Sequence, residues 1–339
     1  MMLQTYLSKL IEGDSLTRNE ATEAMDSIMS GDTPATQIAA FLVAMRMKGE
    51  NSEEVTGFVE SMRSNATPIN TDAESLLDMC GTGGDGAGTF NISTIASIVA
   101  AAGGISVAKH GNRAVSSKCG SADLFNALGV NIEMPVERLG DCLNETGYAF
   151  LFAPLLHPAM KHAIAPRREL KIRTVFNLLG PMTNPASPTL QLLGVYDFEL
   201  AELVAEVLRN IGVKRALVVH GSDGLDEITL TGKTMCVELD GDNISRLDLT
   251  PGSFGLPQLS TVDISGEFEP DECALIATKI LSGEKGPKRD IVVANSAVGL
   301  YLGGKEDSIE KAARLAEELL DSGKALELLE NFSGFTNRA

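Results

Sequence analysis

The chain has 339 residues, and its 28 lysines and arginines against 46 aspartates and glutamates give a formal net charge of −18 at pH 7. Hydrophobic residues make up 44% and charged residues 22% of the sequence, as in ordinary globular proteins, which excludes a mostly disordered chain or a fibrous repeat. The acidic balance also makes nucleic acid and anionic membrane surfaces unfavourable partners.

The five cysteines are widely spaced and form no CxxC pair. Neither a disulfide framework nor a structural zinc site is indicated, and a reducing, cytoplasmic environment is expected. Residues 1–13 lack the apolar core and cleavage site of a signal peptide. Residues 86–108 carry no charge, but their glycines and polar side chains predict a loop and a buried helix rather than a membrane span.

The first 70 residues predict a small domain of short amphipathic helices. Thr17 and Glu20 have the spacing of a capping box, and Thr33 before Pro34 is typical of an N-cap followed by a proline at the first helical position. Residues 38–45 are apolar around the whole helix, which predicts burial on several sides. A unit of four short helices has only a small core of its own, so we expect a homodimer through these helices. The alternative is cover by a later segment of the same chain.

After residue 70, short apolar runs alternate with helical segments. This alternation predicts an α/β domain over residues 71–339, in which a mostly parallel sheet is flanked by helices. The segment 165–188, with two helix-like pieces and a proline-rich turn, is expected to return to the helical domain over residues 1–70. The runs predicted as strands are residues 76–79, 105–108, 149–152, 190–195 and 216–219.

A glycine-rich loop over residues 80–94 follows the first predicted strand and precedes a helix. Glycines let backbone N–H groups approach a phosphate closely, and a helix N-terminus adds unpaired donors, so a phosphate ligand is predicted. A merely flexible loop is the alternative. The loop also contains GxGxxG, but no acidic residue lies between Asp85 and Asp123, where a dinucleotide site needs one, and no Walker motif is present.

Two basic stretches follow. Lys109, Arg113 and Lys118 lie in the acid-free part of the chain and predict a second anion-binding loop, with a solvated basic loop as the alternative. The stretch over residues 161–173 includes Arg167, and most of its charges are expected on a solvated helix face.

Asp226 and Glu227 follow the last predicted strand. Adjacent carboxylates at a strand end suit Mg²⁺ bound to a polyphosphate, because Mg²⁺ prefers oxygen ligands. The Asp-Gly pair just before them is also ordinary turn chemistry, so both interpretations stay open. The sequence has no GxSxG motif and no histidine cluster typical of zinc.

Together these segments resemble the anthranilate phosphoribosyltransferases, in the glycosyltransferase family that also contains pyrimidine nucleoside phosphorylases. The resemblance covers nearly the whole chain and rests on five motifs in order, at residues 80–94, 109–121, 157–160, 180–185 and 223–229. It implies a helical and an α/β domain, a homodimer and Mg²⁺. It also implies transfer of the 5-phosphoribosyl group from 5-phosphoribosyl diphosphate to the amine of anthranilate, with release of diphosphate, in tryptophan biosynthesis.

The resemblance implies residue roles as well. Asn112 and Arg167 match anthranilate contacts, and the implied Mg²⁺ ligands are Ser93, Asp226 and Glu227. The implied substrate-binding residues are Gly81, Gly84, Asp85, Thr89, Asn91, Ile92, Ser93, Thr94, Lys109, His110, Gly111, Asn112, Arg113, Ala114, Val115, Ser116, Ser117, Ser121 and Arg167.

The implied chemistry agrees with these residue types. Mg²⁺, Lys109, Arg113 and backbone N–H groups can stabilise the negative charge that develops on leaving diphosphate. The anthranilate amine is already nucleophilic, so positioning counts for more than a base. His110 is the candidate proton acceptor, with a structural role as the alternative.

Two rival functions stay open at this point. A nucleoside phosphorylase would share the fold, but the sequence of residues 109–113 and the acidic pair at residues 226–227 favour the transferase. A nucleic-acid-binding relative without enzymatic activity would have a basic surface and altered metal residues, whereas this chain is acidic and keeps both carboxylates.

Overall fold

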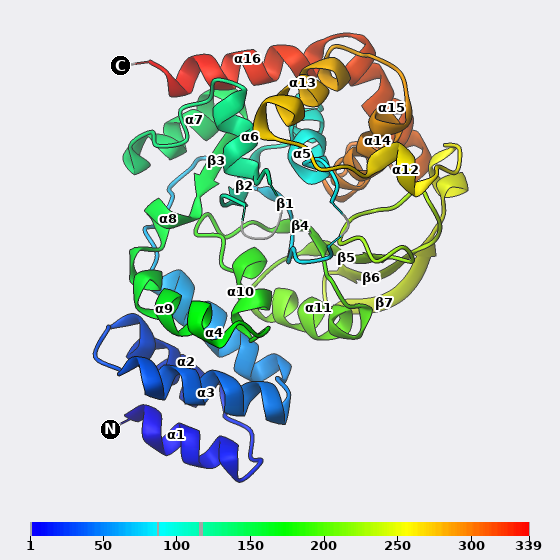
Figure 1. Cartoon of the computed structure of the whole chain (residues 1–339). Coiled ribbons are helices and arrows are strands. Elements are labelled where there is room, and N and C mark those ends of the chain that lie inside the picture. The colour runs from blue at the N-terminus through cyan, green and yellow to red at the C-terminus, as the bar shows by residue number, and fades with distance from the viewer. Residues whose placement is uncertain (1, 87, 115–117, 339) are drawn as a thin grey trace.

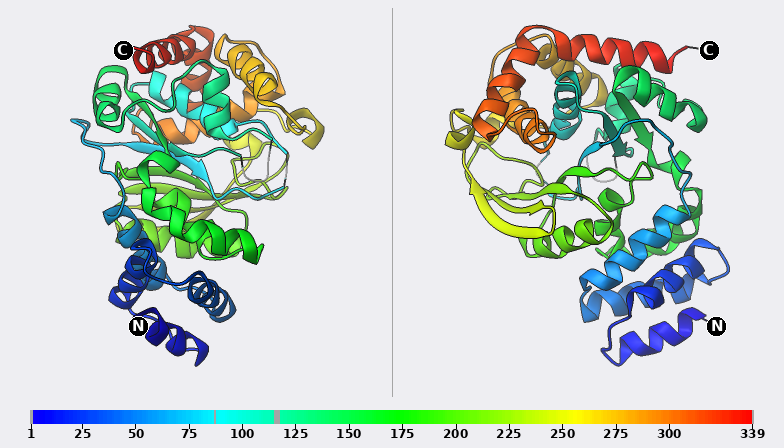
Figure 2. Two further views of the ribbon diagram at one scale, coloured as in Figure 1. Left: turned by 60° about the vertical axis from the view of Figure 1, so that its left-hand side comes forward. Right: turned by 180° about the vertical axis from the view of Figure 1, so that it is seen from behind.

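A computed structural model describes residues 2–86, 88–114 and 118–338. A small helical unit lies at one end of a larger part built on a central sheet, and the two termini lie at opposite ends of the molecule (Figures 1 and 2). Within the described residues, no helix combines the length and hydrophobicity that crossing a membrane requires.

The N-terminal unit forms because its helices bury apolar side chains against one another, and two of them begin at a capping box. Thr17 caps the second helix through the predicted capping box with Glu20. The prediction that Thr33 caps the third helix is wrong, because its hydroxyl donates to the carbonyl oxygen of Ser27 at 2.7 Å; Pro34 is the N-cap, and the helix begins one residue later. The bounds are α1 Met2–Ile11, α2 Arg18–Met29, α3 Ala35–Lys48 and α4 Ser52–Ser64.

A 7-stranded sheet in the order β3-β2-β1-β4-β5-β6-β7 forms the centre of the larger part. The strands β1 to β5 are parallel to their neighbours, as predicted, and β6 and β7 add to β5 as an antiparallel hairpin. The hairpin was not predicted; it turns at Gly241, whose φ of +59° favours glycine. The bounds are β1 Leu77–Gly81, β2 Val107–Gly111, β3 Tyr148–Phe152, β4 Leu190–Gly194, β5 Arg215–Gly221, β6 Thr234–Asp240 and β7 Asn243–Leu249.

The sheet separates two hydrophobic cores, because neighbouring side chains of a strand point to opposite faces. On β4, Leu192 belongs to the core with α5 and α14, whereas Leu193 belongs to the core with the N-terminal helices and α11. The remaining helices of this part are α5 Ile92–Ala102, α6 Ser121–Ala127, α7 Leu139–Thr146, α8 Ala153–Leu156, α11 Ala201–Asn210, α12 Thr261–Ile264, α13 Pro270–Leu281, α14 Pro287–Leu302, α15 Ile309–Asp321 and α16 Lys324–Thr336.

Helices α9 (Lys161–Leu170) and α10 (Phe176–Met182) lie against the N-terminal helices, although they are far from them along the chain. Helix α9 contacts α2 and α3, and α10 contacts α4. Their buried side chains Ala163 and Leu179 share a core with Phe41 and Phe58. We therefore propose that residues 165–188 form one domain with residues 1–70 and that the rest of residues 71–339 forms the other.

Gly57 tests the packing of α4 on α2. A Cβ at this position would lie 2.3 Å from the carbonyl oxygen of Arg18 and 2.9 Å from the Cβ of Ala21. Gly57→Ala is therefore expected to force the helices apart and to lower the free energy of unfolding, measured with urea, by about 1–3 kcal/mol. The control is Gly334→Ala in α16, where a Cβ meets nothing within 4 Å; it is expected to stabilise by up to about 1 kcal/mol. Equal stability of the two variants would contradict this account.

Candidate active site

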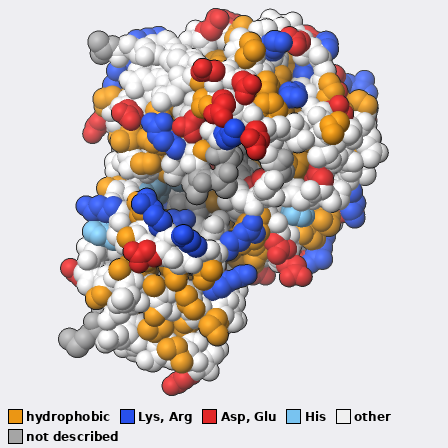
Figure 3. All heavy atoms as spheres, in the orientation of Figure 1, with side chains coloured by type: hydrophobic (Ala, Val, Ile, Leu, Met, Phe, Trp, Pro, Cys, Tyr) orange, Lys and Arg blue, Asp and Glu red, His pale blue; other side chains and the backbone are white. Residues whose placement is uncertain are grey.

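The candidate site lies where the carboxyl ends of β1, β4 and β5 meet. Because these strands are parallel neighbours, the loops that follow them gather at one edge of the sheet. The glycine loop follows β1 and the acidic loop 222–227 follows β5. Figure 3 shows basic side chains gathered beside a hollow, between the helical unit and the larger part.

Two strand glycines let the acidic loop approach the sheet. A Cβ on Gly194 would lie 1.6 Å from the carbonyl oxygen of Asp226, and a Cβ on Gly81 would lie 2.3 Å from its Oδ2. The two glycines are paired across β1 and β4, so together they leave the space that Asp226 occupies. Sequence reasoning missed Gly194, although a glycine inside a strand is a signal of close backbone approach.

The acidic loop is fixed to the glycine loop by hydrogen bonds. The backbone N–H of Gly83 donates to Asp226 Oδ2 at 2.6 Å, and that of Ser93, in the first turn of α5, donates to Glu227 Oε1 at 3.1 Å. Burial raises the pKa of both carboxyls, and the negative charge of Asp85 raises that of Asp226 further. The ionised forms of both carboxyls are thus disfavoured in this site, and a bound cation would stabilise them.

Lys109 supplies positive charge to this site from the neighbouring strand β2. The prediction that it lies in a loop is wrong, since it lies within β2 and is only 2% exposed. Its Nζ donates to the carbonyl oxygen of Met79 and, at 3.4 Å, to Ser93 Oγ. Burial lowers the pKa of the ammonium group, and Asp78, Cys80 and Glu227 oppose that shift.

Two of the charges in the basic segment lie beside carboxylates from outside the acid-free part of the chain. Arg113 pairs with Asp123 at 3.2 Å, and Lys118 lies 3.1 Å and 2.9 Å from carboxylate oxygens of Glu267 and Glu269. These acids come from elements that only the fold brings close.

The remaining predicted residues lie in the two loops or in the helices that follow them. Gly84 accepts a hydrogen bond from Arg173 through its carbonyl oxygen at 2.6 Å, Thr89 forms an isolated antiparallel bridge with Ser265, and Asn91 Nδ2 donates to the carbonyl oxygen of Cys119 at 3.1 Å. Ile92 and Thr94 are buried in α5.

Ser121, at the start of α6, donates to the Asn112 carbonyl oxygen at 3.3 Å, and the N–H of Ala114 donates to Asp123 at 3.0 Å. Val115, Ser116 and Ser117 lie outside the described residues.

Two histidines lie together beside the end of β2. The rings of His110 and His157 are 5.1 Å apart, and the Nε2 atoms of both are buried without a partner among the described residues. Nδ1 of His110 lies 3.2 Å from the carbonyl oxygen of Gly180, which can only accept, so Nδ1 carries the proton and Nε2 is an acceptor. Burial, with His157 adding to it, lowers the pKa of His110 to about 3, and burial lowers that of His157 to about 4.

Arg167 and Asn112 lie on opposite sides of the domain junction. Arg167, on α9, is half-buried, its guanidinium stacks over the ring of Phe176 at 5.0 Å, and it forms no ion pair within the described part of the chain. Burial lowers the pKa of this arginine. Asn112 Oδ1 accepts from the N–H of Arg113 at 2.8 Å.

A helical bundle followed by an α/β domain is the domain arrangement of a family of glycosyl transferases. In the family comparison, residues 4–66 match the helical bundle domain of a glycosyl transferase family and residues 73–326 match its α/β domain. The chain belongs to this family and, within it, to the anthranilate phosphoribosyltransferases.

The relatives give the basis for that placement. Anthranilate phosphoribosyltransferase of Acetivibrio thermocellus is 50% identical over 99% of this chain and 97% of its own length, and that of Moorella thermoacetica is 52% identical over 96% and 95%. The crystal structure of the Thermus thermophilus enzyme, 44% identical, covers 98% of this chain and 99% of its own with a TM-score of 0.93. A Saccharomyces cerevisiae structure in complex with PRPP (5-phosphoribosyl diphosphate) and Mg, 30% identical, covers 98% and 97% with a TM-score of 0.90.

The buried His157 predicts a loss of stability in acid. Its pKa is about 4 in the folded chain, against about 6.5 when unfolded, so below pH 6.5 the unfolded chain binds a proton that the folded chain does not. The contribution of the buried, neutral His157 to the free energy of unfolding is complete above pH 6.5 and is lost as the pH falls toward 4. Between pH 7 and pH 5 the free energy of unfolding, measured with urea, should fall in both proteins. The fall should be about 1–2 kcal/mol smaller in His157→Asn than in the unchanged chain. The same pH dependence in both proteins would contradict the shift.

Proposed function

We propose that this chain transfers the 5-phosphoribosyl group from 5-phosphoribosyl diphosphate to the amine of anthranilate, giving N-(5-phosphoribosyl)anthranilate and diphosphate, in tryptophan biosynthesis. The observation that carries the proposal is the docking of Asp226 and Glu227 on the glycine loop and the first turn of α5. It holds two carboxylates beside the glycine loop and the N-terminus of a helix, where Mg²⁺ and a diphosphate would bind together, in a chain about half identical to enzymes of that name.

The diphosphate side of the site would be built from the glycine loop and β2. Gly81, Gly84, Asp85, Thr89 and Asn91 line the loop, and the N-terminus of α5 adds the positive end of its dipole. Lys109, buried beside Ser93, contributes a fixed positive charge. A preorganised electrostatic site of this kind stabilises the negative charge of a leaving group without reorganising at the moment of reaction.

The donor set fits Mg²⁺. Asp226, Glu227 and the Ser93 hydroxyl are hard oxygen ligands. Burial raises the pKa of both carboxyls, so their ionised forms are disfavoured without a cation and would be stabilised by one. Among the described residues, no group of three His, Cys, Asp or Glu side chains forms a ready metal cage. That agrees with a Mg²⁺ ion held by one or two carboxylates and by substrate phosphates. Bound there, the ion would neutralise charge on the diphosphate.

The anthranilate side would be built from the helical domain and the end of β2. Arg167 would bind the anthranilate carboxylate, because its guanidinium is half-buried and has no carboxylate partner among the described residues. Asn112 would contact the ring substituents. His110 presents Nε2 as an acceptor for the amine, and its lowered pKa makes it a weak base, so it orients the amine more than it removes a proton.

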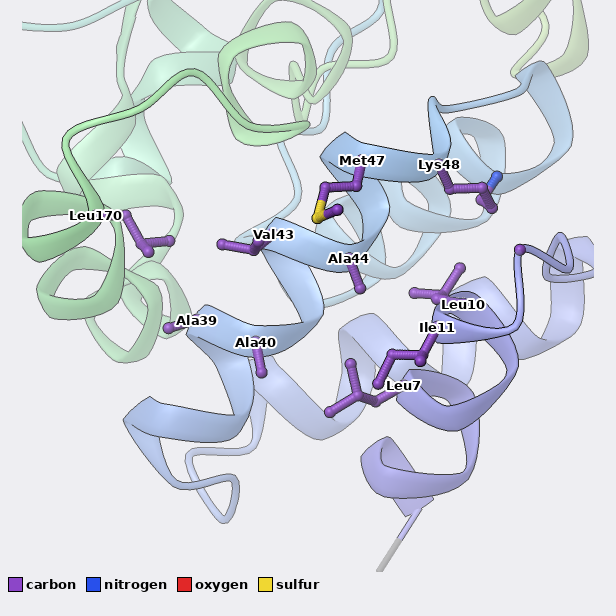
Figure 4. Close-up of a pocket in the computed structure, with 11 residues that line it drawn as sticks. Leu7, Leu10, Ile11, Ala39, Ala40, Val43, Ala44, Met47, Lys48 and Leu170 are labelled. Atoms are coloured by element: carbon purple, nitrogen blue, oxygen red, sulfur yellow. The ribbon is translucent and has the colours of Figure 1, made fainter.

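We also propose a homodimer through the helical unit and a cytoplasmic location. An apolar groove of about 650 Å³ runs between α1 and α3, with Leu170 at its edge (Figure 4). Met47 and Ile11 on its rim are 83% and 71% exposed. An open apolar groove of this size is typical of a protein interface, and the segment after Arg173 does not line it. The five free cysteines fit a reducing compartment.

Turnover tests the function directly. The protein mixed with anthranilate, 5-phosphoribosyl diphosphate and Mg²⁺ should form phosphoribosylanthranilate, detected by loss of anthranilate fluorescence and by mass.

The double variant Asp226→Asn/Glu227→Gln should lose at least about a hundredfold in rate, because it gives up several kcal/mol of charge stabilisation. Its melting temperature at pH 8 should equal or exceed that of the unchanged chain, since buried repulsion is removed. The exposed Asp248→Asn is the control, and full activity of the double variant at low Mg²⁺ would contradict the metal site.

Light scattering tests the dimer. The chain should give about twice 35.9 kDa at micromolar concentration, and Ile11→Glu/Met47→Glu should give a single chain's mass with an unchanged melting temperature. Phe41 is unsuitable for this test, because it is fully buried and packs on Phe58. Val262→Glu on α12, also an exposed apolar residue, is the matched control and should stay dimeric. A mass near 36 kDa for the unchanged chain would reject the proposal.

A further inference from the structure

We propose that Asp78, acting through Asn184, is a positioning residue for this reaction, holding the diphosphate side and the anthranilate side of the site in register. The inference rests on the proposed function and concerns residues that do not touch either substrate. Asp78 lies in β1, and Asn184 lies in the turn over residues 180–185, a sequence motif that the site described above does not use.

Both carboxylate oxygens of Asp78 are used as acceptors. Oδ1 accepts from the backbone N–H of His110 at 3.2 Å, and Oδ2 accepts from Asn184 Nδ2 at 2.9 Å. The Cys80 thiol lies 3.7 Å from the same Oδ2. The side chain of Asp78 is fully buried. It therefore joins the end of β2, where the candidate acceptor His110 lies, to the turn.

Asn184 completes this connection. Its Nδ2 also donates to the carbonyl oxygen of Ala108 at 2.8 Å, and its Oδ1 accepts from the N–H of Ala186 at 2.9 Å. The amide thus uses both of its polar atoms, in a fully buried position, to connect β1, β2 and the turn. Each missing bond would leave a buried polar group without a partner, which is costly.

The same turn is held from three more directions. His110 Nδ1 donates to the carbonyl oxygen of Gly180 at 3.2 Å, Gln191 Nε2 on β4 donates to that of Pro181 at 2.7 Å, and Arg63 Nε on α4 donates to that of Met182 at 3.0 Å. The turn is the C-terminal end of α10, whose Phe176 lies under the Arg167 guanidinium. Fixing the turn therefore fixes the helical side of the site relative to β1 and β2.

A buried carboxylate at this position lowers the free energy of unfolding, and packing alone does not require the charge. Burial raises the pKa of Asp78 to about 6, and the nearby Lys109 opposes that shift. An asparagine of the same shape would avoid the buried charge, but its NH₂ group would face the N–H of His110 or the NH₂ of Asn184, donor against donor. The reaction needs the amine and the ribose carbon aligned to a fraction of an ångström, so the rigid double acceptor has a functional reason.

Glu54 provides a matched control. It is also a fully buried carboxylate that accepts backbone N–H groups, from Leu16 at 2.8 Å and Asn51 at 3.0 Å, and it pairs with Lys48 at 2.8 Å. It lies in the helical unit, at the N-terminus of α4, and none of its partners belongs to the candidate site. Neutralising it should cost stability without disturbing the alignment of the substrates.

The experiment compares Asp78→Asn with Glu54→Gln. For each variant we would measure the melting temperature, kcat and the KM of both substrates, at a temperature where the variant is folded. Asp78→Asn should lower kcat at least about tenfold, with both KM values within about threefold, since misalignment affects the reacting geometry more than binding. Glu54→Gln should lose melting temperature but keep kcat within twofold.

The proposal is overturned if folded Asp78→Asn keeps kcat within twofold of the unchanged chain, or if Glu54→Gln loses kcat to the same extent. If Asp78→Asn does not fold at 25 °C, Gln191→Leu decides in the same assay. It removes the bond from Gln191 Nε2 to the Pro181 carbonyl oxygen and the longer one, at 3.5 Å, to the Cys80 sulfur, and it leaves every bond of Asp78 and Asn184 in place. A kcat lowered at least about threefold supports the proposal, whereas a smaller change overturns it. Absence of turnover by the unchanged chain would contradict the proposed function instead, independently of Asp78.

Discussion

The site depends on one close approach between two pieces of backbone. Asp226 can lie against the ends of β1 and β4 only because Gly81 and Gly194 have no side chains. A methyl group on Gly194 would lie 1.6 Å from the carbonyl oxygen of Asp226. That approach lets Asp226 and Glu227 reach the N–H groups of Gly83 and Ser93. The acidic loop and the glycine loop are therefore parts of one structure, which the parallel sheet brings to the same edge.

The electrostatics of the site follow from burial more than from net charge. The chain carries −18 overall, and its candidate site gathers further carboxylates in a buried place where their pKa values rise. Lys109 reaches the same region from inside the sheet, whereas Arg113 and Lys118 are held by acids of other elements. The binding of a polyanionic substrate that we propose here would depend on fixed, local positive groups, and a cation would balance the acids.

The two halves of the molecule meet at the turn over residues 180–185. Helices α9 and α10 return from the α/β part to pack on the N-terminal helices, so Arg167 stands on the helical side while the glycine loop belongs to the sheet side. The bonds from β1, β2, β4 and α4 to this turn give the junction a defined geometry. In the function that we propose, each substrate would be held by a different half, so the reaction would need such a junction.

The sequence by itself determined the class of fold, the capping of α2, the five parallel strands, and the glycine loop and acidic pair, since periodicity, glycine content and adjacent carboxylates are local signals. It did not show that Lys109 and His110 continue β2, because buried polar residues in a strand look like a loop until their partners are known. Gly194 could have been noticed as a glycine inside a strand, but Asp78 and Asn184 carry no local signal at all. Their roles come from contacts across more than 100 residues of chain, between Asp78 and Asn184 and between Gly81 and Asp226. Only the tertiary structure decides which distant groups share a buried space, because hydrogen-bond partners and desolvation depend on packing rather than on order along the chain.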